Sequence, residues 1–92
     1  MKTLVLGAAI VDIIMKIPKL PKSGEDVLCT ERKLTIGGCA YNVATILKHF
    51  NVNHDLVVPI GEGSYATMIK QELIHEGYQL HIQDDRADNG YC

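Results

Sequence analysis

Apolar and polar positions alternate along the chain in blocks that predict strands and helices in turn. Residues 3–10 form a nearly continuous apolar run, which is typical of a strand covered on both faces in a parallel sheet. The proline- and lysine-rich segment 16–26 predicts a surface loop. Residues 27–36 then alternate loosely, which predicts a strand with one solvated face.

The next block predicts a helix that begins after Gly37-Gly38 and ends at Asn51 or Asn53. Its apolar residues recur every three or four positions, the spacing of one helix face. The stripe expected to face the core consists of Ala40, Val43, Ala44, Leu47 and Phe50.

The last third repeats this order of strand and helix. A strand is expected at 55–60, followed by a turn at Gly61-Glu62-Gly63. Ser64 is expected to cap a second helix, and Gly77 to end it in the left-handed conformation. The apolar stripe of this helix consists of Tyr65, Met68, Ile69 and Leu73.

A third strand is expected at 78–83, followed by an acidic turn at 84–90. Strands and helices that alternate in this way predict an α/β fold, a parallel sheet with flanking helices. The chain ends where a further strand would start, and no partner for that strand remains, so the pattern looks truncated.

Composition narrows the classes of function. The 92 residues suffice for one domain at most. A net charge of −2 gives no electrostatic footprint for nucleic acid or an anionic membrane, and no apolar run has the ~18–20 residues of a membrane span. Three cysteines without metal-site spacing favour a reducing, cytoplasmic setting, and the histidines show no metal motif.

Two groups of residues are candidates for chemistry. The pair Gly37-Gly38 lies at a strand-to-helix junction, where backbone N–H groups can face a hydroxyl or an anion, and Asn42 lies one turn later. An asparagine amide both donates and accepts, which suits a pair of hydroxyls. The alternative is a simple helix-start turn in which Asn42 bonds only the backbone.

Asp12 is the second candidate, because it follows the first apolar run. In open α/β sheets, ligands bind at the carboxyl ends of the strands, where a carboxylate can accept hydrogen bonds from neighbouring hydroxyls. Asp12 and Gly37-Gly38 are therefore expected on the same rim of the sheet. The alternative is a cap or a solvated carboxylate.

The motifs resemble the ribokinase-like carbohydrate and nucleoside kinases, the PfkB family. Gly-Ala-Ala-Ile-Val-Asp at 7–12 matches the first strand, and Gly-Gly-Cys-Ala-Tyr-Asn-Val-Ala at 37–44 is close to the signature Gly-Gly-x-x-x-Asn-x-Ala. Residues 61–77 lie where the family has a Gly-x-Asp turn and an amphipathic helix. The resemblance covers nearly the whole chain.

The resemblance implies an N-terminal part of a single kinase domain that transfers the γ-phosphoryl group of ATP, with Mg²⁺, to a hydroxymethyl group of a sugar or nucleoside. It implies a substrate pocket and a β-lid over that pocket, formed by residues from about 13 to 36. It allows a homodimer through this lid. Asn89 to Cys92 would start the next lid strand, with Tyr91 or Cys92 facing the sugar. The pocket residues implied are Asp12, Gly37, Gly38 and Asn42.

The sequence departs from the family pattern in three places. Glu62-Gly63-Ser64 replaces the aspartate-containing turn, and Cys39 stands where ribokinases carry a lysine. The second family signature, which holds the catalytic base and the anion hole, has no counterpart. This chain alone is therefore expected to be inactive, with the ATP site mostly outside it, and neither the role of Cys39 nor that of Cys92 follows from the sequence.

Two other classes remain as alternatives. One is a small non-catalytic α/β binding or interaction module, and the other is a piece of a dinucleotide-dependent oxidoreductase, although residues 7–12 lack the G-x-G-x-x-G spacing. If the chain is part of a longer protein, it should expose the apolar sheet edge that the rest would cover, and the chain alone should self-associate or aggregate.

Overall fold

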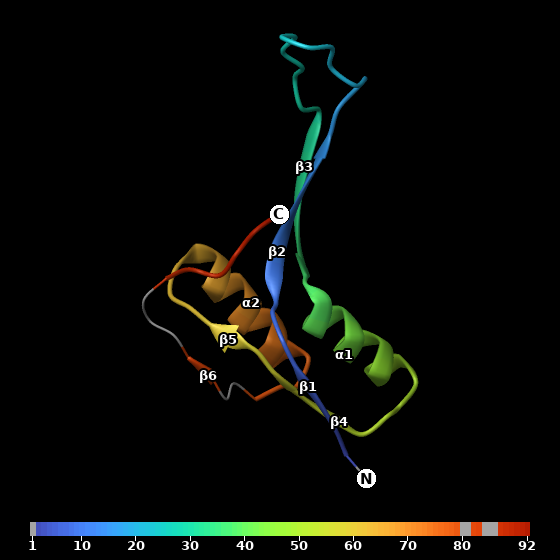
Figure 1. The fold of residues 1–92 in the computed structure, drawn as a ribbon, viewed down its shortest axis with the longest axis vertical. Coiled ribbons are helices and arrows are strands. Elements are labelled where there is room, and N and C mark those ends of the chain that lie inside the picture. The colour runs from blue at the N-terminus through green and yellow to red at the C-terminus, as the bar shows by residue number, and fades with distance from the viewer. Residues whose placement is uncertain (1, 80–81, 84–86) are drawn as a thin grey trace.

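The computed structural model describes residues 2–79, 82–83 and 87–92 and shows an α/β fold (Figure 1). The elements in chain order are β1 (Thr3–Leu6), β2 (Ile10–Lys16), β3 (Glu31–Gly37), α1 (Cys39–His49), β4 (His54–Val57), β5 (Pro59–Ile60), α2 (Ser64–His75) and β6 (Ile82–Gln83). The acidic positions 84–86 and residues 80–81 of the expected third strand lie outside the described residues. In the part that is described, no helix is long and apolar enough to cross a membrane.

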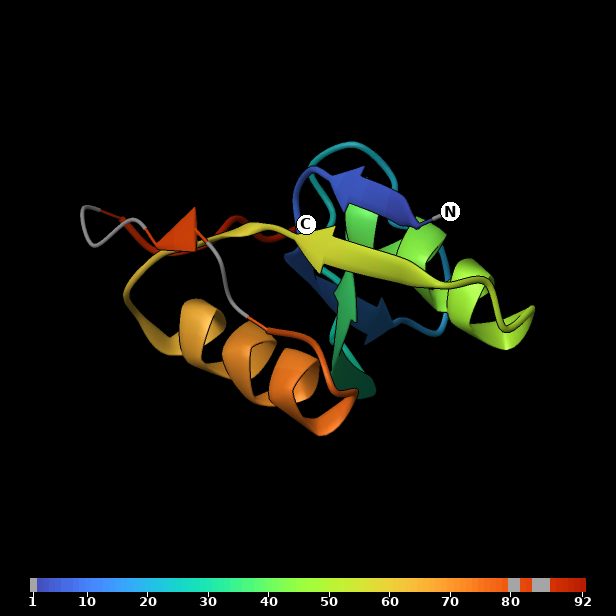
Figure 2. The same ribbon diagram turned by 90° about the horizontal axis from the view of Figure 1, so that it is seen from below.

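The body of the molecule is built on parallel strand pairs. β1 pairs with β4, and β5 pairs with β6, both in parallel. Helix α1 lies between β1 and β4 in the chain and packs on both, as expected for a crossover between parallel strands. Figure 2 shows α2 lying along one side of the strands.

A long antiparallel hairpin, β2–β3, projects from this body and gives the molecule its longest dimension, 53 Å (Figure 1). Its register pairs Asp12 with Thr35 and Ile10 with Gly37. The last residues of the chain lie along the other edge of β2, where Tyr91 bridges Val11 in parallel. The expectation that this last segment has no partner in the chain is therefore wrong.

The expected strands have different bounds in the structure. The strand expected at 55–60 is divided into β4 and β5 at Val58, and of the strand expected at 78–83 the described residues show only Ile82–Gln83 as a strand. The run 3–10 is not one strand, because the chain leaves β1 at Gly7 and re-enters a strand at Ile10. Gly7 lies so close to α1 that an added Cβ would be 2.9 Å from the Cβ of Ala40. The segment 27–30 is not part of β3, so the strand expected at 27–36 was placed about four residues too early.

The core lies where both helices meet the strands. The buried apolar residues are Val5, Ala9, Val11, Ala40, Ala44, Leu56, Val58, Ile60, Ala66, Ile69 and Leu73. The α2 stripe is confirmed, with Ile69 and Leu73 fully buried. The α1 stripe is narrower than expected, because Val43 and Phe50 are exposed and only the alanines are buried. Small side chains on α1 allow β1 to pack close to the helix.

Both helices end in the same way. At the end of α1, Asn51 has a φ of 57° and its N–H donates to Lys48 O, while Val52 N–H donates to Leu47 O. At the end of α2, Gly77 has a φ of 87° and equivalent hydrogen bonds form. This is the paired hydrogen bonding of a Schellman motif, and it confirms the two expected helix ends.

Polar contacts join the two helices side by side. Tyr41 O–H donates to Glu72 Oε1 at 3.1 Å, and Lys48 pairs with Glu76. Burial, followed by the hydrogen bond to Glu72 and its charge, raises the pKa of Tyr41 to about 12. The phenol therefore stays protonated and keeps donating across the helix pair at all ordinary pH values.

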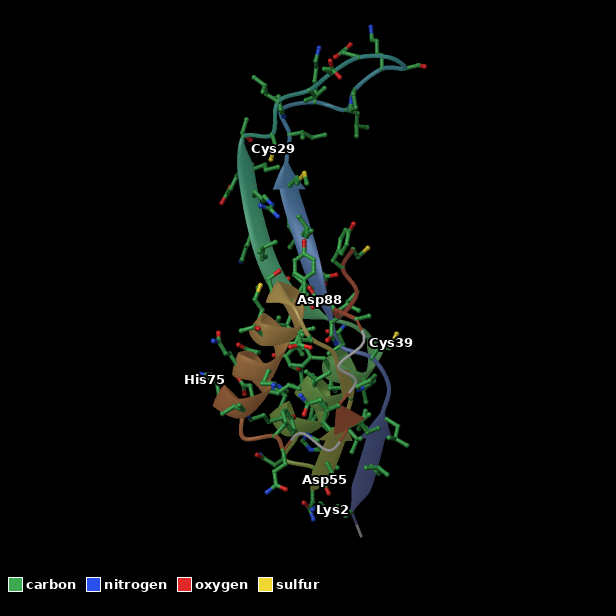
Figure 3. The ribbon with its side chains drawn as sticks, turned by 90° about the vertical axis from the view of Figure 1, so that its left-hand side faces the viewer. Lys2, Cys29, Cys39, Asp55, His75 and Asp88 are labelled. Carbon is green, nitrogen blue, oxygen red and sulfur yellow. The ribbon has the colours of Figure 1, made fainter. Side chains whose placement is uncertain are left out.

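Helix α2 is capped from a distant part of the chain. Its N-cap residue is Gly63, which has no side chain, and the expected cap by Ser64 is wrong because Ser64 already lies in the helix. The Asp88 carboxylate accepts hydrogen bonds from Tyr65 N–H at 3.2 Å and Ala66 N–H at 2.7 Å. These are the amides that a capping side chain normally satisfies, and Figure 3 shows Asp88 at the start of α2.

The cap gives a prediction about acid stability. Desolvation raises the pKa of Asp88, but hydrogen bonds from the Ala66, Asn89 and Tyr65 amides outweigh it, so the pKa lies below its ordinary value of 3.8. The stability that the carboxylate contributes is complete above about pH 4 and is lost as the pH falls through the folded-state pKa. Asp88→Asn should lower the melting temperature by about 2–8 °C at pH 7. Melting scans across pH should show this gap closing below about pH 4, whereas a gap independent of pH would contradict the assignment.

The exposed surface of β1 gives a second prediction. Leu4 and Leu6 are 59% and 64% exposed, on the face opposite the buried Val5. The 92-residue chain alone should therefore self-associate at micromolar concentration, and Leu4→Lys with Leu6→Lys should reduce this. Ile74→Lys is the matched control, because Ile74 is 61% exposed but lies on α2, outside both β1 and the hairpin. Sedimentation velocity measures the association state of the chain and of both variants. A monodisperse monomer of the unsubstituted chain would show that this face does not drive association.

Candidate functional site

The Asp12 side chain lies over the last residue of β3. Asp12 is in the interior of β2, and its carboxylate occupies the space that a side chain at Gly37 would need. Gly37 itself is buried. Any larger residue there would displace the carboxylate, so the glycine sets the position of Asp12 beside the start of α1.

The expected place of Asp12, after the carboxyl end of the first parallel strand, is wrong. The strand that carries it is antiparallel to β3 and belongs to the projecting hairpin. The apolar run had concealed the break at Gly7-Ala8-Ala9, because small residues in a turn are also apolar. Asp12 nevertheless lies beside the Gly37-Gly38 turn, as expected. The register of the hairpin pairs Asp12 with Thr35, two residues before Gly37.

Gly38 brings the start of α1 against the link between β1 and β2. It is the N-cap of the helix with a φ of 97°, a conformation that other residues rarely adopt. A Cβ on Gly38 would lie 2.6 Å from Ala8 O and 3.0 Å from Ala9 Cα. Both the conformation and the space therefore require glycine.

Asn42 lies on the first turn of α1, and its side chain is exposed. Its N–H donates to Gly38 O at 3.0 Å, the first hydrogen bond of the helix. The amides before it have no partner within the helix and carry the positive end of its dipole. The Asp12 carboxylate, this helix end and the Asn42 amide together offer acceptors and donors suited to a polyhydroxylated ligand.

Cys92 is a neighbour of Asp12, and it is one of the two residues for which the resemblance implied a place facing the sugar. Cys92 N–H donates to Val11 O at 2.9 Å, and Ile13 N–H donates to Cys92 O at 2.7 Å. Since Tyr91 is bridged to Val11, the alternation of the strands places Cys92 on the face of Asp12 and Tyr91 on the other face. The Tyr91 ring lies 5.2 Å from that of Tyr65, between centroids.

A cavity of about 700 Å³ lies away from this site and is lined by residues of β3, α1 and α2, among them Ile36, Tyr41, Met68 and Glu72. A smaller one, of about 230 Å³, lies at the strand ends and is lined by Ala8, Ile10, Gly61 and Gly90 among others. Neither of these two cavities is lined by Asp12 or Asn42.

The described residues contain no cluster of metal-ligating side chains for Mg²⁺. Among them, no three His, Cys, Asp or Glu side chains are grouped closely enough to hold a metal ion. Cys39, which replaces the lysine of ribokinases, is exposed at the first position of α1 (Figure 3). No residue of this chain is therefore assigned to the cofactor or the metal.

Comparison with known proteins agrees with this geometry. Residues 1–92 match the family model described as pfkB family carbohydrate kinase. The uncharacterized sugar kinase YegV of Escherichia coli (strain K12) is 35% identical over 89 residues, which is 97% of this chain and 28% of that protein.

Solved structures show the same fold. The nucleoside kinase of Methanocaldococcus jannaschii, an archaeal member of the ribokinase family, matches with a TM-score of 0.75 and 20% identity, covering 98% of this chain and 31% of that one. The ribokinase of Cryptococcus neoformans in complex with ADP matches with a TM-score of 0.78 and 21% identity, covering 98% and 28%.

The chain belongs to the pfkB family of carbohydrate kinases, and its fold is ribokinase-like. It spans about 30% of the length of the relatives that it matches. The family assignment removes the dinucleotide-dependent oxidoreductase from consideration, because that class rested only on the glycine and alanine content of the first strand.

The close contact at Gly38 gives a prediction. Gly38→Ala combines a left-handed backbone with a clash against Ala8 O, so it should cost about 3 kcal/mol or more of the free energy of unfolding. Gly24→Ala is the matched control, because Gly24 has a φ of 76° but nothing lies within 4 Å of an added Cβ. It should cost only about 1–2 kcal/mol. Urea unfolding of the natural protein measures both, and equal costs would mean that the close approach is unimportant.

Proposed function

We propose that this chain is the substrate-binding and lid portion of an ATP-dependent sugar or nucleoside kinase that phosphorylates a hydroxymethyl group. The observation that carries the proposal is the Asp12 carboxylate, held over Gly37 beside the N-terminus of α1. The family assignment and the names of the relatives support the class of substrate.

In this proposal each site residue has a defined role. Asp12 accepts hydrogen bonds from two neighbouring hydroxyls of the sugar, because a carboxylate offers several acceptor positions. Gly37 leaves room for the Asp12 carboxylate, and Gly38 lets the start of α1 approach the link between β1 and β2, so both glycines position the groups that bind the sugar. The exposed amide of Asn42 donates to one hydroxyl and accepts from another.

The hairpin is the lid of the proposed pocket. Residues from about 13 to 36 lie in the part that projects from the body, and Asp12 lies at its base (Figure 1). A cover over the sugar would exclude water, which favours phosphoryl transfer to the sugar over hydrolysis. Its exposed apolar side chains, such as Met15 and Leu28, suit contact with a second copy, so a homodimer through the lid belongs to the proposal.

ATP supplies the phosphoryl group, with Mg²⁺ to neutralise its charge, as in phosphoryl transfer generally. The ADP named for the Cryptococcus neoformans ribokinase supports the nucleotide. No residue of this chain serves as the catalytic base, so the base and the anion-binding groups come from residues outside it. A cytoplasmic location, where ATP is abundant, completes the proposal.

Substitution of Asp12 tests the proposal. The natural protein should have an intact mass about three times that of this chain. In that protein, Asp12→Asn should lower kcat/KM for the sugar about 10- to 150-fold, because a charged acceptor is lost. Asn42→Ala should act in the same direction. The matched control is Asp55→Asn, which should leave kcat/KM unchanged, because Asp55 lies in β4 in a surface ion pair with Lys2, outside the lid and the candidate site.

The assay is ATP-dependent phosphorylation of a panel of sugars and nucleosides. A protein without phosphotransfer that still binds a polyol through Asp12 would indicate a binding module instead. Full activity of Asp12→Asn would contradict the proposed site.

A further inference from the structure

Asp88 and Asn89, which we call the Asp88–Asn89 clamp, join parts of the fold that are distant in the sequence. The Asn89 side chain makes three hydrogen bonds to backbone groups. Its Oδ1 accepts from Gly61 N–H at 2.7 Å, and its Nδ2 donates to Pro59 O at 3.0 Å and to Ala9 O at 3.4 Å. One amide therefore bridges the end of β5 and the residue just before β2.

Asp88 adds a third attachment, to helix α2. Besides capping Tyr65 and Ala66, its Oδ1 accepts from Asn89 N–H at 2.8 Å. The carboxylate fills the space that a side chain at Gly63 would need. Gly63 stands at the aspartate position of the Gly-x-Asp turn in the resemblance, so a carboxylate from elsewhere in the chain occupies the place of the missing one.

The clamp is followed at once by the strand that flanks Asp12. Val11 N–H donates to Gly90 O at 3.1 Å, and Val11 O and Ile13 N–H bond to Cys92. The backbone groups of Val11 and Ile13 therefore bond to the segment 90–92 on one edge of β2, while Asp12 is paired with β3 on the other edge. The segment 90–92 has only these few hydrogen bonds along β2, so its start must be anchored for its register to persist.

We infer that the Asp88–Asn89 clamp sets the position of Asp12 by anchoring the strand 90–92 to the end of β5 and to α2. Asn89 is thus a positioning residue for substrate binding, and the inference rests on the proposed role of Asp12. The clamp also attaches the base of the lid to helix α2, which already contacts β2 and β3. Loosening the clamp should free β2 along one edge and displace the carboxylate.

The test combines hydrogen exchange with kinetics in the natural protein. Asn89→Ala should lower the protection of the Val11, Ile13 and Cys92 amides about tenfold. The amides of Ile69 and Leu73 in α2 should keep their protection. KM for the sugar should rise several-fold while KM for ATP stays unchanged.

Two further variants complete the design. Asn89→Asp keeps the shape of the side chain and an acceptor for Gly61 N–H but loses both donated hydrogen bonds, so it should repeat the effect if the alanine variant fails to fold. Asn53→Ala is the matched control, because Asn53 is an exposed loop asparagine. It should change neither exchange nor KM.

The outcomes separate the clamp from the proposed function. An equal loss of protection in α2, unchanged protection at the three strand amides, or a selective loss without a change in KM would each overturn the inference. If Asp12→Asn keeps full activity, the proposed function fails, and the exchange pattern still decides whether the clamp docks the strand.

Discussion

The close approach of the α1 N-terminus to the link between β1 and β2 is the contact on which the rest of the structure depends. Gly38 allows it, because its backbone is left-handed and a side chain would meet Ala8 O. This contact holds β3 and α1 against the strand link, and it thereby places Gly37 beneath the Asp12 carboxylate. If the helix started further away, as a side chain at Gly38 would require in a close-packed interior, the carboxylate and the helix end would separate.

The parts of the fold that depend on neighbouring residues in the chain could be predicted from the sequence. Asn51 and Gly77 end their helices as expected, and Ile69 and Leu73 are buried, because helix ends and stripes depend on neighbouring residues. The cap of α2 could not be predicted, since Ser64 looked suitable and Asp88 lies 22 residues beyond Ala66. The break of the first strand was missed because Gly7 and its alanines read as apolar.

The candidate site was also predicted only in part, because local motifs identify its residues but long-range pairing sets their positions. Its four residues fall in motifs that local pattern and family resemblance both pick out, and the geometry brings Asp12 to the Gly37-Gly38 turn. The position of Asp12 within an antiparallel hairpin depends on pairing between β2 and β3, which a single sequence does not encode locally. The resemblance implied that Tyr91 or Cys92 would face the sugar, and only the pairing with β2 places Cys92 on the face of Asp12. The place of Asn89 could not be predicted, because it depends on long-range hydrogen bonds to β5.

The capping of α2 by a residue from later in the chain also has a consequence for the order of folding. During synthesis, the whole helix leaves the ribosome before Asp88, so its first turn lacks a side-chain acceptor until the loop that carries Asp88 closes. Closing such a loop costs entropy that increases slowly with its length. The start of β2, the end of β5 and the start of α2 therefore become fixed together in one late step, and this step should raise the cooperativity of folding at the expense of its rate.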